Sequence, residues 1–246
     1  MEAMNVLAII QARTGSTRLP NKIFSKLGGK SFLYHVVERL RPSKEITDII
    51  VATTTAKGDD KIEHWCSENK VNFFRGSEEN VLERYYKAAK HFKADIVVRV
   101  TADDPFKDYR IIDEAITTLK EEGMDFVCNN NPVSFPEGLD VEVMTFDVLE
   151  LSYNNAISDF EREHVTQHIH RNKNKFRIFN IINHKNLSNY RWTVDTKEDY
   201  IFAKKVYEEL YDSRNIFLPE DIYKLLENNP DLMEINKEVG KSDLYK

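Results

Sequence analysis

The fold is decided by the stretch Val6-Leu-Ala-Ile-Ile-Gln-Ala-Arg-Thr-Gly-Ser-Thr-Arg-Leu-Pro-Asn-Lys22. Its first part, Val6–Ile10, is a continuous apolar run, which predicts a β-strand buried on both faces. A polar and basic loop follows directly and extends through Lys30. Ligands of parallel sheets bind outside the carboxyl ends of the strands. The position of this loop therefore predicts a binding site.

The first half of the chain alternates apolar runs with amphipathic segments, which predicts an α/β domain with parallel strands and crossover helices. Repeats and Pro/Gly/Ser linkers are lacking, so we expect a single domain over residues 1–246 with a peripheral tail from about 230 to 246. The expected strands are 46–52, 71–74, 96–100, 125–128, 139–146 and 176–182. The expected helices start at Ser31, Asn80, Thr196 and Pro219 or span 59–69, 110–122, 146–157 and 161–171.

Composition is that of an ordinary soluble protein. The 246 residues are 41% hydrophobic, and the mean hydropathy is −0.53. The apolar run at Val6–Ile10 is far shorter than the roughly 20 residues of a membrane span, and signal-peptide features are lacking. The cysteines, Cys66 and Cys128, form neither a disulfide framework nor a paired metal motif. We therefore expect a cytoplasmic protein that does not bind membranes.

Charge is distributed unevenly along the chain. The net charge of −6 argues against a nucleic-acid partner, which would need a basic face. Through Lys44, however, eight basic residues and two acidic ones give +6, so the remainder carries −12. Ala3 to Val37 contains no acidic residue. A cationic start on an acidic protein suits a small anionic ligand.

The basic loop offers the groups that a phosphate site needs. Arg13 and Arg18 carry planar forks, Lys22 carries a compact charge, and Gly15 lets the backbone turn close to a ligand. The loop is neither a Walker A loop nor a G-x-G-x-x-G motif. A solvated surface loop is the alternative, but the position after the first strand favours phosphate binding.

Aspartates stand directly after another predicted strand and directly before a predicted helix near the C-terminal end. Asp103 and Asp104 come directly after the strand 96–100, and Asp195 stands just before the helix that starts at Thr196. Such oxygen ligands suit Mg²⁺ bridging substrate phosphates. Asp195 could instead cap its helix, and Asp104, which precedes Pro105, could be a turn residue.

Two further segments carry candidate polar groups. Asp140 and Glu142, two residues apart on a predicted strand, would share one face and could contact a substrate or a second metal, although a solvated face explains them nearly as well. Arg162 and His164 could bind an anion, and the alternative for His164 is a surface position. Arg99, inside an apolar strand, indicates a buried ion pair or a ligand contact.

Several motifs resemble the cytidylyltransferases, in particular the SpsF-type branch related to the CMP-KDO and CMP-sialate synthetases. The loop Gln11–Lys22 is similar to their nucleotide-binding signature. The other matches occur in family order at 51–54, 74–85, 99–105, 137–142, 161–166 and 191–196. The resemblance implies a three-layer α/β/α, Rossmann-like nucleotidyltransferase fold with a mostly parallel sheet. It also implies transfer of CMP from CTP with Mg²⁺, release of pyrophosphate, and a homodimer.

The resemblance also assigns roles to residues. It places Mg²⁺ on Asp103 and Asp195, with Asp104 as a possible third ligand, although SpsF-type sequences often have cysteine at that position. It places Arg13, Arg18 and Lys22 on the phosphates. The nucleotide-binding candidates are Gln11, Ala12, Gly15, Ser16, Thr53, Gly76, Ser77, Asn80 and Arg84, the last of which could instead form a surface ion pair. The acceptor-binding candidates are Asp140, Glu142, Arg162 and His164.

These features predict an enzyme in which an acceptor oxygen attacks the α-phosphorus of CTP in line, so that charge stabilisation and positioning dominate catalysis. The expected acceptor is anionic: a sugar acid such as a nonulosonic acid, or a phosphonate or phosphate, in the synthesis of surface polysaccharide or glycoconjugate precursors. A metal-dependent GT-A glycosyltransferase is one alternative, but it would have no triphosphate leaving group for the basic loop to hold. A non-catalytic nucleotide-binding homologue is the other.

Overall fold

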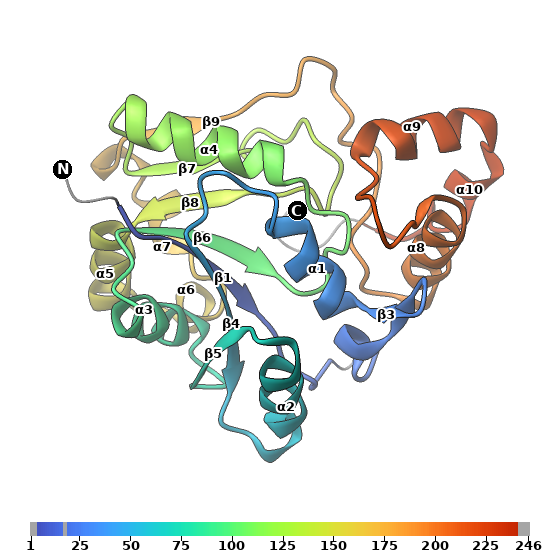
Figure 1. The fold of residues 1–246 in the computed structure, drawn as a ribbon. Helices are drawn as coiled ribbons and strands as arrows, with labels where there is room; N and C mark the ends of the chain where they lie inside the picture. The colour runs from blue at the N-terminus through green and yellow to red at the C-terminus, as the bar shows by residue number, and fades with distance from the viewer. Residues whose placement is uncertain (1–3, 17–18, 241–246) are drawn as a thin grey trace.

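A computed structural model describes residues 4–16 and 19–240, and its centre is a seven-stranded sheet (Figure 1). The strand order is β5-β4-β1-β6-β8-β7-β9, and only β8 runs antiparallel to its neighbours. The strands are β1 (Val6–Gln11), β4 (Asp48–Thr54), β5 (Asn72–Gly76), β6 (Ile96–Thr101), β7 (Phe126–Cys128), β8 (Glu142–Thr145) and β9 (Ile178–Asn180). The predicted mostly parallel sheet is confirmed.

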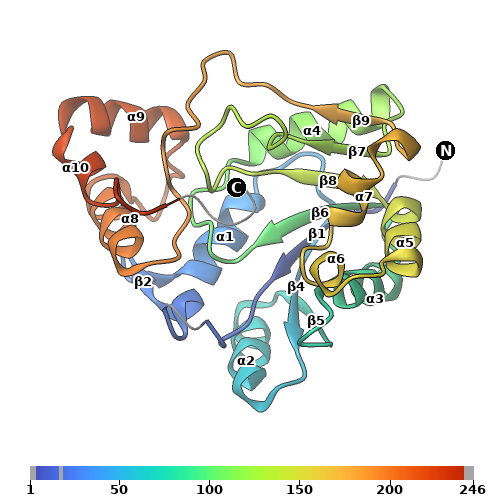
Figure 2. The ribbon, with the colours of Figure 1, turned by 180° about the vertical axis from the view of Figure 1, so that it is seen from behind.

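Helices cover both faces of the sheet, which confirms the predicted three-layer α/β/α arrangement (Figures 1 and 2). Val6, Ala8 and Ile10 of β1 pack on one side, and Leu7 and Ile9 pack on the other. The first side is covered by α1 (Phe32–Leu40), α2 (Asp60–Asn69) and α4 (Tyr109–Glu121). The second is covered by α3 (Val81–His91), α5 (Phe146–Asn155) and α7 (Gln167–Arg171), with α6 (Asp159–Glu163) beside them.

A third apolar cluster lies beside the sheet and joins the start of the chain to its end. Phe32 and Phe106 pack there with Trp192 and with α8 (Lys197–Leu210) and α9 (Pro219–Asn228), followed by α10 (Asp231–Glu234). The side chain of Asn236 is buried and donates to the Asp199 carboxylate at 3.0 Å. The expectation of a peripheral tail from about residue 230 is therefore wrong for Asn236.

Several local predictions need correction. The expected loop through Lys30 contains a short helix, η1 (Lys22–Phe24), and a small hairpin of β2 (Lys26–Leu27) and β3 (Lys30–Ser31). The expected helix 161–171 is divided into α6 and α7 at Val165, whose φ of 41° is left-handed. The expected strand 139–146 begins only at Glu142. Two short helices complete the chain, η2 (Lys57–Asp59) and η3 (Lys173–Lys175).

Polar caps explain where the predicted helices start. The side chains of Ser31 and Asn80 accept from backbone N–H groups in the first turns of α1 and α3. Thr196 and Asp199 form a reciprocal capping box at α8. Among the described residues, no helix is both long and apolar enough to span a bilayer.

Gly138 lies just before β8 at a point where the chain is closely packed. Its φ is +104°, and a Cβ there would lie 2.6 Å from the backbone nitrogen of Thr193. We predict that Gly138→Ala lowers the free energy of unfolding by about 3 kcal/mol, since backbone strain and overlap add. Gly29→Ala is the matched control, because φ is +83° but nothing lies within 4 Å of the added Cβ. Urea denaturation measures both variants, and equal losses would contradict the predicted overlap.

Candidate active site

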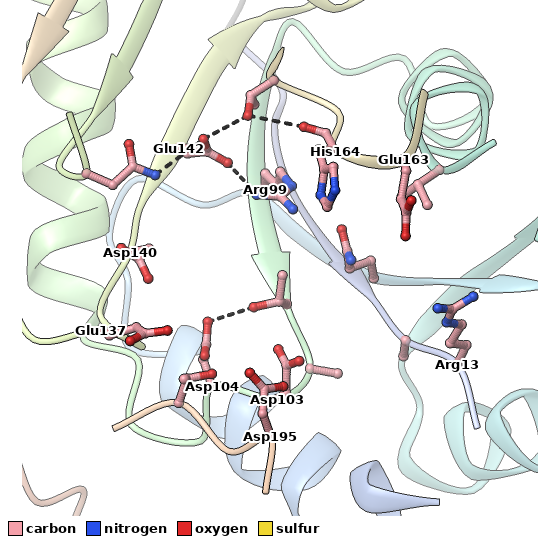
Figure 3. A pocket seen from close by; sticks show the side chains of 18 of the residues that line it. Arg13, Arg99, Asp103, Asp104, Glu137, Asp140, Glu142, Glu163, His164 and Asp195 are labelled. Atoms are coloured by element: carbon pink, nitrogen blue, oxygen red, sulfur yellow. Dashed lines mark hydrogen bonds and ion pairs between the residues drawn. The ribbon is translucent and has the colours of Figure 1, made fainter. Parts of the chain in front are cut away.

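A cavity of about 950 Å³ opens at the carboxyl ends of β1 and β6 and the start of β8. Figure 3 shows Asp103 and Asp195 on one side of it and Arg99, Glu142 and His164 on the opposite side, with Arg13 between them at the edge. Because side chains alternate along a strand, Arg99 and Glu142 project from the same face as the apolar residues that pack under α3 and α5. The sheet thus provides the floor of the site.

Lys22 joins the two predicted metal-binding carboxylates. Its Nζ lies 2.8 Å from Oδ2 of Asp103 and 2.9 Å from Oδ1 of Asp195, and it also donates to the backbone oxygen of Val194. Burial opposes the ammonium charge, but the carboxylates outweigh it and raise the pKa of Lys22 above its ordinary value. Burial also opposes ionisation of Asp103, but the Lys22 ammonium lowers that pKa to about 2. Three segments distant in sequence therefore meet at one shared cation.

Arg191 holds Asp195 in place. Its guanidinium contacts Glu137 at 2.7 Å, Asp199 at 2.9 Å and Asp195 at 3.3 Å. The Asp199 carboxylate also accepts from the backbone nitrogen of Asp195 at 3.1 Å. Burial opposes the charge of Arg191, but Asp199 and Glu137 raise its pKa. Sequence reasoning did not single out Arg191, although it stands at the start of the motif that contains Asp195.

Asp104 has a different partner from Asp103. Its Oδ2 lies 2.9 Å from Nζ of Lys107 and accepts from Thr101 at 2.6 Å. Lys107 also donates to the backbone oxygen of Asp140. Burial raises the pKa of Asp104, against the opposing effect of Lys107. The structure therefore pairs Asp104 with Lys107, and a ligand role for it stays a prediction.

The basic loop is held by a buried carboxylate of η2. Asp59 accepts from the backbone nitrogen of Thr14 at 2.8 Å, from its hydroxyl at 2.7 Å, and from Thr54. Burial opposes the charge, but these hydrogen bonds lower the pKa of Asp59. The anchored loop places Arg13, Gly15 and Ser16 along the cavity. Arg18, predicted to contact phosphate, lies outside the described residues.

Arg84 reaches the cavity from α3. It is 2% exposed, and its Nη1 donates to the backbone oxygen of Ser77 at 2.5 Å. Its Nε–H meets no acceptor in the described part of the chain. Burial lowers the pKa of Arg84. The alternative of a surface ion pair is therefore wrong, and a buried guanidinium faces the site.

The structure brings together most of the predicted site residues. Those that line the cavity are Gln11, Ala12, Arg13, Gly15, Ser16, Lys22, Arg84, Asp103, Asp104, Asp140, Glu142, His164 and Asp195.

The other predicted residues lie elsewhere. Thr53 is buried in β4. Gly76, Ser77 and Asn80 belong to the segment that joins β5 to α3, where the backbone oxygen of Ser77 accepts from Arg84, and they are not among the described residues that line the cavity. Arg162 is exposed, is paired with Asp159 at 3.6 Å, and also falls outside that lining. Arg162 lies on the exposed side of α6, whereas Glu163 at the end of that helix and His164 directly after it line the cavity.

Glu142 and Asp140 are not a pair on one strand face. Asp140 precedes β8, and Glu142 is the first residue of that strand, directly opposite Arg99 of β6. Glu142 Oε2 accepts from Arg99 Nη1 at 2.5 Å, and Oε1 accepts from Thr166 at 2.9 Å. Burial works against its ionisation, but Arg99 lowers the pKa of Glu142 well below its ordinary value. The ion pair expected of Arg99 is thus with Glu142.

Comparison with known proteins identifies the family. Residues 7–238 match the family described as Cytidylyltransferase. The chain is 41% identical over 241 residues to Uncharacterized protein MJ1063 of Methanocaldococcus jannaschii, which covers 96% of each protein. It is 34% identical to the spore coat polysaccharide biosynthesis protein SpsF of Bacillus subtilis, over 92% of this chain and 96% of that one. The chain belongs to the cytidylyltransferase family.

Two further similarities are informative. A solved cytidylyltransferase of Leptospira borgpetersenii superposes with a TM-score of 0.89 at 34% identity, covering 97% of this chain and 99% of that one. The 3-deoxy-manno-octulosonate cytidylyltransferase of Geobacter sulfurreducens is 34% identical over 120 residues, which is 48% of this chain and 46% of that protein. The predicted family and its nucleotidyltransferase fold are confirmed.

The Lys22 ion pairs predict a pH-dependent stability. In Lys22→Met, Asp103 and Asp195 would face each other without their shared cation, so we expect a loss of about 2 kcal/mol near neutral pH. The loss should shrink toward about pH 4, because protonation of one carboxylate relieves the repulsion. In the parent, the lowered pKa of Asp103 stabilises the fold above about pH 4, and this contribution disappears as the pH falls toward 2.

Chemical denaturation across this pH range measures the effect. Lys26→Met is the control, because that lysine is exposed. A Lys22→Met deficit that is independent of pH would contradict the assigned ion pairs.

Proposed function

We propose that this member of the cytidylyltransferase family transfers CMP from CTP to an anionic acceptor, with release of pyrophosphate. The observation that carries the proposal is the meeting of Asp103 and Asp195 at one cation, beside a loop with exposed cationic and backbone donors. Triphosphate and divalent cation bind side by side in such an arrangement. The similarity to SpsF supports a role in polysaccharide precursor synthesis.

The nucleotide is proposed to bind between the basic loop and α3. Arg13 and the loop backbone at Gly15 and Ser16 would receive the phosphates. Arg84 supports this placement, because within the described residues no carboxylate lies at ion-pair distance from its buried guanidinium. An unpaired buried charge is costly, so a bound anion would stabilise it.

The residues present fit Mg²⁺. The described residues contain no group of three or more His, Cys, Asp or Glu arranged as a metal cage. Mg²⁺ needs only one or two carboxylates, because waters and substrate phosphates complete its octahedron. Asp103 and Asp195 already share a cation, and Arg191 holds Asp195, so this pair would hold the metal. When bound, Mg²⁺ would neutralise phosphate charge and orient the reacting oxygens.

The proposed chemistry is an in-line displacement. An acceptor hydroxyl oxygen forms a bond to the α-phosphorus while the bond from that phosphorus to the bridging oxygen of pyrophosphate breaks. The hydroxyl proton passes to solvent or to a neighbouring carboxylate. Arg13 and Lys22 would stabilise charge on the phosphates, and the cavity walls would align the acceptor.

A sugar acid is the proposed acceptor class. The relative in Geobacter sulfurreducens is named for 3-deoxy-manno-octulosonate, and its similarity to this chain spans about half of each protein. The cavity of about 950 Å³ has room for a nucleotide together with a sugar. Octulosonate is therefore the first acceptor to test, followed by nonulosonic acids and phosphonates.

Arg84→Met separates nucleotide binding from stability. Removing a buried charge that lacks a counter-ion should change the free energy of unfolding by no more than about 1 kcal/mol. CTP affinity should fall about tenfold or more, because a charge-assisted contact is lost. Isothermal titration with CTP and Mg²⁺ measures the affinity.

Arg39→Met is the matched control for this variant. Arg39 is equally buried, but it donates to the backbone oxygens of Lys107 and Phe217 at 2.7 Å each. Arg39→Met should therefore have a lower free energy of unfolding than the parent. The folded fraction of this variant should bind CTP with the affinity of the parent. Unchanged CTP affinity in Arg84→Met would overturn the nucleotide placement.

Asp195→Asn tests the reaction itself. The parent should release pyrophosphate when incubated with CTP, Mg²⁺ and octulosonate or another sugar acid. Asp195→Asn should lower the rate about a hundredfold or more, since the metal-binding charge is lost. Asp231→Asn, at an exposed position, is the control. Release from UTP but not CTP would refute the base assignment, and a near-normal rate in Asp195→Asn would refute the metal assignment.

A further inference from the structure

Unsatisfied buried polar atoms gather around the cavity at two places. The first pair, Gln11 Oε1 and Arg84 Nε, lies near the nucleotide loop. The second pair, Arg99 Nε and Asn130 Oδ1, lies near Glu142 at the start of β8. Buried donors and acceptors are normally satisfied, so each such atom calls for an explanation. The nucleotide proposed above accounts for the first pair. The second pair has no role in that proposal.

Arg99 is held by one edge of its guanidinium and leaves the other edge open. Its Nη1 donates to Glu142, whose second oxygen is occupied by Thr166. In the described structure, this is the single hydrogen bond of a side chain that has five N–H donors. The side chain is 12% exposed, so bulk water reaches it poorly. The Nε and Nη2 donors form the parallel pair that matches a carboxylate.

Asn130 and Arg99 contact opposite oxygens of one carboxylate, that of Glu142. The Nδ2 of Asn130 lies 3.4 Å from Oε1 of Glu142, the same carboxylate that holds Arg99. The other amide atom, Oδ1, is buried without a donor among the residues described. Both side chains line the cavity, so one ligand with a carboxylate and hydroxyl groups would supply partners for the Arg99 donors and for Asn130 Oδ1.

The position of Arg99 favours the acceptor over the triphosphate. Figure 3 shows Arg99 beside Glu142 and His164, across the cavity from Asp103 and Asp195 and away from Arg13. Asp103 is nevertheless close enough for its charge to raise the pKa of Arg99. An anion on Arg99 would thus lie near the reacting phosphate without occupying the phosphate loop.

We propose that Arg99 and Asn130 form the acceptor subsite, in which Arg99 binds the acceptor carboxylate and Asn130 Oδ1 accepts from a hydroxyl of the same molecule. Glu142 then acts as a positioning residue rather than as an acceptor ligand, because it binds Nη1 of Arg99 and leaves Nε and Nη2 for the ligand. This inference rests on the proposed function, because it names what the CMP-accepting substrate presents. It also replaces Arg162, which lies outside the described lining, as the residue that binds the acceptor anion.

The test compares 3-deoxy-manno-octulosonate with its neutral methyl ester, which differs only at the carboxylate, and uses methylphosphonate as a tetrahedral anion. Titration calorimetry is run on the protein alone and on protein saturated with Mg²⁺ and α,β-methylene-CTP, which cannot release pyrophosphate. The parent should bind octulosonate about tenfold more tightly than the ester. Methylphosphonate should bind more weakly than octulosonate.

Variants then assign the preference to Arg99. Arg99→Gln alone would leave the buried Glu142 carboxylate without its arginine counter-ion. The double variant Arg99→Gln/Glu142→Gln instead keeps a neutral hydrogen-bonded pair at the same positions. It should lose the preference for octulosonate over the ester and still bind the CTP analogue with unchanged affinity. Arg99→Lys should also lose most of the preference, because an ammonium lacks the fork. Arg162→Gln is the matched control and should behave like the parent.

The outcomes separate the two proposals. Failure of the CTP analogue to bind the parent would reject the proposed function, whereas the octulosonate and ester titrations without nucleotide would still test Arg99. Equal binding of octulosonate and ester by the parent, or a preference that survives in the double variant, would overturn the acceptor subsite. Loss of the preference in Arg162→Gln would transfer the role to that arginine.

Discussion

The site is organised by one ammonium group that two carboxylates share. Lys22 comes from the segment after β1, Asp103 from the end of β6 and Asp195 from the residues before α8. Each carboxylate would repel the other if the cation were absent, so the positive charge between them stabilises the convergence of the three segments at neutral pH. The third apolar cluster supports the same arrangement, because it packs Leu27 and Phe32 near the start of the chain against Val194 and α8.

Around this ammonium, the buried charges divide into two classes. Some are satisfied inside the protein: Arg191 by three carboxylates, and Asp104 by Lys107. Others are satisfied only in part, such as Arg84 and the outer edge of Arg99. The first class builds the frame, because complete pairing makes burial tolerable. The members of the second class line the cavity, and they are the groups to which we assign ligand oxygen atoms in the proposals above.

Much of this was predictable because it depends on local chemistry. Continuous apolar runs predicted buried strands, and caps such as Ser31, Asn80 and Thr196 marked the helix starts. Motif order predicted the family. The errors occurred where tertiary contacts override local pattern. Val165 takes a left-handed conformation that divides a predicted helix, and Asn236 is drawn into the core by Asp199. Neither effect has a signature in neighbouring residues.

The sequence by itself determined the alternation of strands and helices and the strand ends that carry the polar clusters, while the family resemblance singled out Asp103 and Asp195 as candidate metal ligands. These properties follow from periodicity and from residue chemistry within short segments. Only the tertiary structure decided which charges meet. It paired Asp104 with Lys107 and Glu142 with Arg99, and it placed Arg162 on the surface. Ion pairing depends on distances across the sheet, and a linear pattern does not contain those distances until the strand order and the crossovers bring the segments together.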